Sequence, residues 1–204
     1  MSWARIYSDL FNPLIMNVVV VIVSAFLSGV DFEEIIFTGI AAAGLIGVLP
    51  YWYLRRQINR KVIDDVDVKE KLQRLRPLAF TISSFLIFAG LLAIWQPGED
   101  HFLLFIVLSY AVCAILAAII TRFWKISLHN ACFTAVWAIV LIQLWLISAS
   151  EFYIYLFSIL ALLSIVLMGA ARVKLRVHTV GQVIGGVLFG LILPVLLFYL
   201  FIFP

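Results

Sequence analysis

The sequence predicts an all-α polytopic membrane protein, a bundle of six to seven transmembrane helices. Hydrophobic residues make up 65% of the 204 residues and charged residues only 12%, which is more apolar than a soluble domain tolerates. Apolar runs recur at lengths close to the ~20 residues that an α-helix needs to cross a bilayer. All 14 Lys and Arg residues fall before the first run or in alternate gaps between these runs. Together, these observations predict a single integral membrane domain over residues 1–204.

Seven apolar runs are candidate spans. In chain order they cover residues 13–27, 35–54, 78–95, 102–120, 131–147, 152–170 and 183–203. The first run has the length of a signal peptide, but Ala25-Phe26-Leu27 is a poor cleavage site and acidic residues follow it. We therefore expect the first run to be a span.

Prolines and glycines add detail to these spans. Pro50 lies inside the second run and is expected to kink it, whereas Pro77 begins the third, where a missing N–H costs little. The last run opens with two Gly-xxx-Gly spacings, formed by Gly181, Gly185, Gly186 and Gly190. Such spacings predict that this helix packs closely on its neighbours.

Charge is distributed one-sidedly. If the runs alternate in direction, one face of the membrane carries residues 1–12, 55–77, 121–129 and 172–182, and with them every Lys and Arg. The links on the other face carry six of the 11 acidic residues. The positive-inside rule then predicts a cell-membrane protein whose basic face is cytoplasmic, with the amino terminus inside. Because topology accounts for the net charge of +3, no nucleic-acid partner is expected.

Few residues remain for other chemistry. Cys113 and Cys132 fall in or beside apolar runs without a CxxC or a His-rich neighbourhood, so we expect free, buried thiols and no metal site. His101 sits in an acidic link on the opposite face and is interpreted as an interfacial residue. A small transporter is a third-ranked alternative, because the span interiors contain almost no ionisable residues.

Three polar islands on the basic face could carry a function. In the first, Lys69 and Arg76 are seven residues apart, about two helical turns, so both head groups can point the same way. Alone, this pattern is also typical of a topology signal or of an anionic-lipid contact. In the second, Ser127 and His129 directly precede the fifth run, where a helix amino terminus suits an anion. A capping Ser and an interfacial His are the alternative.

The third island leads into the last run. Arg172 lies six residues before His178, and Gln182 lies four residues after it. That spacing predicts a hydrogen bond from one imidazole nitrogen to Gln182 on the same helical face. A histidine this close to lipid needs a partner or a task.

Taken in order, the three islands resemble the type 2 phosphatidic acid phosphatase superfamily, which shares its helical core with the vanadium haloperoxidases. That family's pattern is Lys, six residues, Arg-Pro; then Pro-Ser-Gly-His; then Ser-Arg, five residues, His, three residues, Asp. The chain matches it at Lys69, Arg76, Pro77, Ser127, His129, Arg172 and His178. It departs from it at Ile126, Leu128, Ala171 and Gln182. The resemblance implies a phosphatase-like core over about residues 69–190.

The resemblance also implies roles. His178 would attack phosphorus and form a phosphohistidine, while His129 would protonate the leaving oxygen and then activate water. The phosphate oxygens would be held by Lys69, Arg76, Ser127 and Arg172. No metal or other cofactor is implied. Gln182 stands where the family has Asp, so it would orient His178 without supplying charge, and activity is expected to be lowered.

A phosphate site at the ends of membrane helices implies a substrate whose tail stays in lipid. We expect a lipid phosphate or diphosphate: a polyprenyl diphosphate or phosphate, phosphatidate, or phosphatidylglycerophosphate. Two alternatives remain open besides the transporter. One is a lipid phosphotransferase, in which an acceptor hydroxyl replaces water. The other is a non-catalytic lipid-phosphate binding protein on the same fold.

Overall fold

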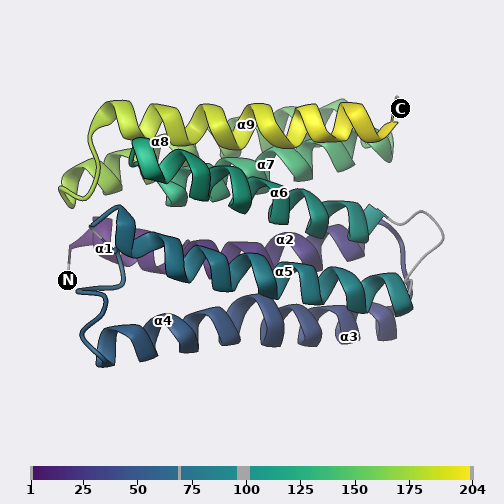
Figure 1. The fold of residues 1–204 in the computed structure, drawn as a ribbon. Helices are drawn as coiled ribbons and strands as arrows, with labels where there is room; N and C mark the ends of the chain where they lie inside the picture. Colours follow the sequence, from purple (N-terminus) through teal and green to yellow (C-terminus); the bar gives the residue numbers. More distant parts are fainter. Residues whose placement is uncertain (1, 69, 96–101, 203–204) are drawn as a thin grey trace. The chain divides into compact units, whose positions relative to one another are not determined.

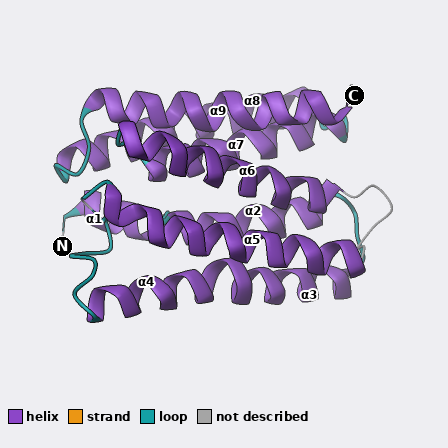
Figure 2. Cartoon of the chain, viewed as in Figure 1, coloured by secondary structure: helices purple, strands orange, loops and turns teal. Residues whose placement is uncertain are grey.

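A computed structural model describes residues 2–68, 70–95 and 102–202 (Figure 1). Within those ranges the regular structure is helical throughout, without a strand (Figure 2). The α-helices are α1 (Trp3–Leu10), α2 (Pro13–Leu27), α3 (Phe32–Ala42), α4 (Leu49–Asn59), α5 (Leu75–Trp95), α6 (Phe102–Phe123), α7 (Leu128–Leu146), α8 (Glu151–Lys174) and α9 (Val180–Ile202). A π-helical segment (Ala43–Val48) connects α3 to α4, and a 3-10 turn (Leu72–Arg74) directly precedes α5.

The predicted number of spans is confirmed. Among the described residues, six helical stretches are long and apolar enough to cross a membrane: Phe32–Asn59, Leu72–Trp95, Phe102–Phe123, Leu128–Leu146, Glu151–Lys174 and Val180–Phe201. The expected first span, α2, is 15 residues long. It qualifies only when joined to α1, from which it is bent by 47°. The protein is therefore a polytopic helical membrane protein with six spans, or seven if the bent pair counts as one.

Pro50 interrupts the second span without ending it. The residues before α4 form the π-helical segment, in which the N–H of Leu49 donates to the carbonyl of Gly44, five residues back. Pro50 then occupies the first turn of α4, where its missing N–H is tolerated. The helix therefore widens in the turn before this proline, and the kink expected there stays a prediction.

The chain divides into two compact units. One contains Met1–Met16 and Ile126–Pro204, and the other contains Asn17–Lys125. Residues 69–190, over which a phosphatase-like core is expected, include parts of both units.

In the unit formed by Asn17–Lys125, aromatic pairs align α3 and α4 against α5. The rings of Phe37 and Trp95 lie 4.1 Å apart, edge to face, near one end. Near the other end, Tyr53 and Phe80 stack at 4.3 Å with an interplanar angle of 6°. Because the residue numbers rise along one partner and fall along the other, α5 runs antiparallel to the second span.

In the other unit, α9 packs closely against α7, as its glycines predict. A Cβ added at Gly186 would meet the carbonyl oxygen of Ser127, and one added at Gly190 would overlap that of Ala131. Gly181, by contrast, has open space within 4 Å of an added Cβ. The second Gly-xxx-Gly pair is therefore the one that brings the two helix backbones together.

In the part of the chain that the structure describes, three helices end with a residue in the left-handed region that is not glycine. These are Lys61 (φ 57°) after α4, Ser148 (φ 52°) after α7 and Arg176 (φ 55°) after α8. After α7, the N–H groups of Ser148 and Ala149 donate to carbonyls three and five residues earlier, at 3.1 and 2.9 Å. This pair of bonds defines a Schellman motif, a sharp stop that satisfies carbonyls at a helix end.

Candidate functional site

The spacing of Arg172 and His178 is explained by how α8 ends. The N–H of Val177 donates to the carbonyl of Arg172 at 3.3 Å, and that of Arg176 donates to Val173 at 2.9 Å. These are the two bonds of a Schellman motif, with Arg176 in its left-handed position. The motif turns the chain within a few residues, so His178 follows the helix end directly.

His178 is fixed from its other side by a capping box at the start of α9. The N–H of Gln182 donates to Thr179 Oγ1 at 3.3 Å, and the N–H of Thr179 donates to Gln182 Oε1 at 3.2 Å. His178 Nδ1 lies 3.0 Å from the same Oε1. The hydrogen bond predicted between His178 and Gln182 is therefore present. The sequence pattern Thr-x-x-Gln is typical of such a reciprocal cap. Only the contact between His178 and Gln182 was predicted from the sequence.

The capping box also assigns the tautomer of His178. A backbone N–H can only donate, so the side-chain atom that Thr179 contacts is the carbonyl oxygen of Gln182. The same oxygen can only accept from Nδ1. In neutral His178 the proton therefore sits on Nδ1, and Nε2 carries the lone pair. The side chain is buried, at 6% exposure.

The second motif lies beside the third. The backbone N–H of Ser127 donates to the carbonyl of Gln182 at 3.0 Å. Ser127 is the N-cap of α7: its Oγ accepts from the N–H of Asn130 at 3.4 Å and donates to Asn130 Oδ1 at 2.9 Å. Both side chains are fully buried. The capping role considered for Ser127 is thus present, and its hydroxyl proton is directed to Asn130.

The remaining predicted residues are placed as follows. His129 is the second residue of α7 and is half-buried. Arg76 is the second residue of α5, is exposed, and belongs to the other compact unit. Lys69 lies outside the described residues. The structure thus brings Ser127 and Gln182 into contact, and it joins His178 to both through Gln182.

Arg74 has a structural role that its sequence position did not reveal. The charge pattern only placed it among the basic residues of the predicted cytoplasmic face. Its side chain is instead 4% exposed, and Nε donates to the carbonyl of Val68 at 2.8 Å while Nη2 reaches that of Asp67 at 3.4 Å. Val68 has a φ of 44°, a strained value for a β-branched residue. Arg74 therefore stabilises the loop immediately before Lys69.

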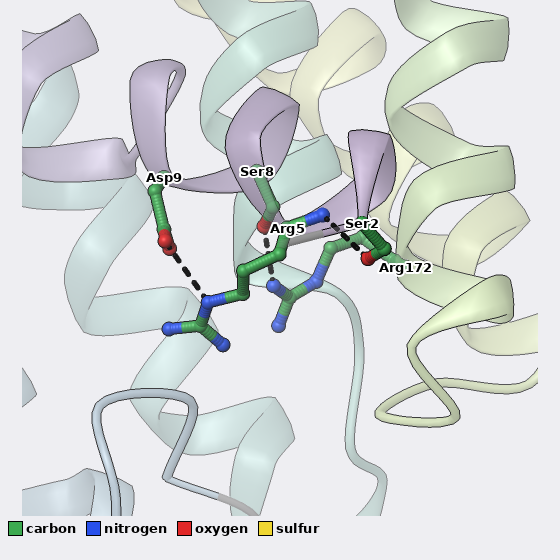
Figure 3. A network of polar contacts seen from close by, with 5 residues as sticks. All are labelled: Ser2, Arg5, Ser8, Asp9 and Arg172. Atoms are coloured by element: carbon green, nitrogen blue, oxygen red, sulfur yellow. Dashed lines mark hydrogen bonds and ion pairs between the residues drawn. The ribbon is translucent and has the colours of Figure 1, made fainter.

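Ser8 is a neighbour of the site that the sequence did not indicate. Arg172 Nη1 donates to Ser8 Oγ at 2.6 Å, and both side chains are 1% exposed (Figure 3). On the same helix, Tyr7 Oη donates to the carbonyl of Ser164 in α8 at 3.1 Å. Residues 1–12 had been interpreted only as a topology signal. The structure shows that α1 docks on α8 and contacts the arginine of the third motif.

The pattern that could have located α1 is its amphipathicity. Ala4 and Ser8, four residues apart, are buried, while Trp3, Ile6 and Leu10 are 45%, 53% and 60% exposed. Small buried residues on one face and large apolar ones on the other are typical of a helix that lies in a membrane interface. The pattern identifies the docked face, but not the residue that Ser8 contacts.

The assembled end of α7, α8 and α9 suits an anion. The amino termini of α7 and α9 meet there, since Ser127 bonds to Gln182, and each contributes the positive end of a helix dipole. Arg172 and Lys174 occupy the last turn of α8 and add full positive charges. His178 lies between these helix ends, on the loop from α8 to α9. Positive helix ends and basic side chains favour an anion, and a phosphate group is the anion expected from the sequence.

Comparison of the chain with protein-family models, with curated proteins and with solved structures found no match. The functional argument therefore depends on the residues and geometry of the site.

Proposed function

We propose that this protein is a membrane-embedded, metal-independent phosphatase that hydrolyses a lipid phosphate or diphosphate through a phosphohistidine intermediate. The proposal draws on the resemblance to the type 2 phosphatidic acid phosphatase superfamily. It also assigns the catalytic face to the cytoplasmic side of the cell membrane.

One observation carries the proposal: a buried histidine held in the tautomer that a nucleophile needs. His178 Nδ1 is directed at Gln182 Oε1 at 3.0 Å, so in the neutral ring the nucleophilic lone pair is the one on Nε2. A neutral imidazole with one nitrogen oriented by an acceptor is the arrangement in which histidine acts as nucleophile or base. Arg172 and the amino termini of α7 and α9 supply positive charge beside it.

The reaction has two displacements. In the first, the Nε2 lone pair of His178 forms a bond to phosphorus as the bond from phosphorus to the lipid oxygen breaks, and His129 protonates that oxygen. In the second, His129 removes a proton from water, the water oxygen bonds to phosphorus, and the N–P bond breaks. Inorganic phosphate leaves and His178 is regenerated. Lys69, Arg76, Arg172 and Ser127 stabilise the charge on the transferring group.

The substrate class follows from the position of the site. Ser127 precedes α7 and His178 precedes α9 by two residues, and both helices are long and apolar enough to span the membrane. A phosphate bound at these helix ends lies at membrane-surface depth, so the rest of its molecule can remain in lipid. Polyprenyl diphosphates and phosphates, phosphatidate and phosphatidylglycerophosphate all meet this description.

The direct test is phosphate release by purified protein from a panel of these lipids in mixed micelles. We expect release from at least one lipid, inhibition by vanadate, and loss of activity in His178→Ala. Arg122→Ala serves as a matched control: it removes an exposed basic residue at the end of α6 and should leave turnover unchanged. A His178→Ala variant as active as the parent would refute the mechanism.

A non-catalytic lipid-phosphate binding protein is the second candidate. Two observations favour it: Gln182 supplies no charge to His178, and the Ser127 hydroxyl donates to Asn130. Lipid binding without turnover, with an affinity unaffected by His178→Ala, would support this candidate. A phosphotransferase shares the first displacement and would be recognised by transfer to an added acceptor alcohol.

A further inference from the structure

We infer that Ser8 is a positioning residue for Arg172, and that α1 is therefore a functional part of the phosphate site. This inference rests on the proposed function, because it assigns Ser8 its role through a residue proposed to bind phosphate. Ser8 lies 164 residues from Arg172 in the chain and belongs to none of the three motifs.

The contact is short and shielded from water. Arg172 Nη1 lies 2.6 Å from Ser8 Oγ, and each residue is only 1% exposed (Figure 3). A hydrogen bond from a charged donor is stronger than one between neutral groups, and burial strengthens it further. Such a bond restricts the guanidinium to one orientation. Arg172 is also fixed at its backbone, where its carbonyl accepts from Val177 in the Schellman turn.

The chemistry of the partner matters as much as its position. A serine hydroxyl orients a guanidinium without neutralising its charge. A carboxylate at the same place would form an ion pair and compete with phosphate. On the same helix, the carboxylate of Asp9 pairs with Arg5 at 2.9 Å. The hydroxyl and the carboxylate of α1 are thus directed to different arginines.

Separate contacts hold α1 in place, so Ser8 is not needed to dock it. Tyr7 Oη donates to the carbonyl of Ser164 in α8 at 3.1 Å. The ring of Phe11, which follows α1, lies 5.3 Å from that of Phe133 in α7. Removing the Ser8 hydroxyl should therefore leave the helix docked while removing this one restraint on the guanidinium. The same contacts provide a matched control, since Tyr7→Phe removes one α1–α8 hydrogen bond without touching Arg172.

The experiment measures vanadate affinity by calorimetry and lipid phosphate hydrolysis for the parent, Ser8→Ala, Ser8→Asp and Tyr7→Phe. Ser8→Ala should weaken vanadate binding and lower kcat/KM, each by roughly tenfold. Ser8→Asp should retain the contact but neutralise the charge, with a loss of roughly a hundredfold. Tyr7→Phe should match the parent. If Ser8 had only a structural role, Ser8→Asp would keep the parental vanadate affinity and kcat/KM, because an ion pair to Arg172 would replace the hydrogen bond.

The outcomes separate this inference from the proposed function. If the parent hydrolyses lipid phosphate but Ser8→Ala and Ser8→Asp bind vanadate as the parent does, the inference is overturned and the phosphatase stands. If the parent binds vanadate without turnover, the phosphatase falls, and the affinities of the Ser8 variants still decide the inference. A parent that binds no vanadate overturns the role assigned to Arg172, and the inference with it.

Discussion

Gln182 combines two functions in one side chain. Its Oε1 accepts from the N–H of Thr179, which caps α9, and from Nδ1 of His178. An i to i+4 spacing made the histidine contact predictable from the sequence. The tautomer was not predictable, because it depends on a backbone donor that fixes which amide atom faces the ring.

We predict that Gln182→Leu lowers kcat roughly a hundredfold, because the imidazole loses the acceptor that orients it. Gln182→Glu should retain both hydrogen bonds and at least parental activity. The added carboxylate stabilises protonated His178, so the acid limb of the pH–rate profile should move to higher pH. Rates measured from pH 5 to pH 9 with one lipid phosphate test both expectations.

Thr179→Val is the matched control for Gln182. It removes the hydroxyl that accepts from the Gln182 N–H but keeps the backbone N–H that orients Oε1. Stability should fall by about 1 kcal/mol with little change in kcat. Equal losses of kcat in Thr179→Val and Gln182→Leu would show that Gln182 acts only as a helix cap.

Ser148 tests the conformational cost of a left-handed residue away from the site. With φ at 52°, it occupies a position that usually holds glycine. Ser148→Gly should raise stability by about 0.5–1 kcal/mol, measured by thermal unfolding in detergent, with unchanged activity. Ser150→Gly, at a residue with φ −59° and no side-chain cap bond, should give no gain. A gain in both would exclude relief of backbone strain as the cause.

The elements were largely predictable, because hydrophobic length alone sets where a membrane helix begins and ends. The exceptions occur where local backbone geometry intervenes. A π-helical segment over Ala43–Val48 precedes Pro50, and the short first run needs α1 to reach spanning length. Neither the π-helical segment nor the docking of α1 follows from apolar periodicity.

We predict that the α7–α9 contact depends on Gly190. Gly190→Ala would overlap the carbonyl of Ala131 and should cost about 1–3 kcal/mol, because backbone cannot move aside as a side chain can. Gly181→Ala is the control: its added Cβ meets open space, and alanine favours a helix over glycine. The two variants should therefore shift the unfolding temperature in opposite directions. A neutral Gly190→Ala would contradict the close approach of the helices.

On the scale of the whole molecule, the sequence pattern and the structure agree on a polytopic helical protein, and sidedness stays a prediction. The ordered islands were recognisable by spacing. The contact between Arg172 and Ser8, 164 residues apart, was not, because no local pattern encodes it. The roles of Lys69 and Arg76 likewise stay predictions.

The predicted orientation can be tested by cysteine labelling in intact cells. Lys71→Cys and Glu151→Cys would be introduced after Cys113 and Cys132, both half-buried, are replaced by alanine. Lys71 and Glu151 are exposed and belong to the basic and acidic faces predicted from the charge pattern. An impermeant maleimide should modify only Glu151→Cys. Labelling of Lys71→Cys alone would place the basic face outside.

The most direct test of the central claim is to trap the covalent intermediate. Purified protein would be mixed with a lipid phosphate labelled at the phosphorus, quenched in alkali after milliseconds to seconds, and digested for peptide mapping. We predict an acid-labile, alkali-stable phosphoryl group on His178 that is absent from His178→Ala. Phosphate release by the parent without any label on His178, or with the label on another residue, would contradict the account.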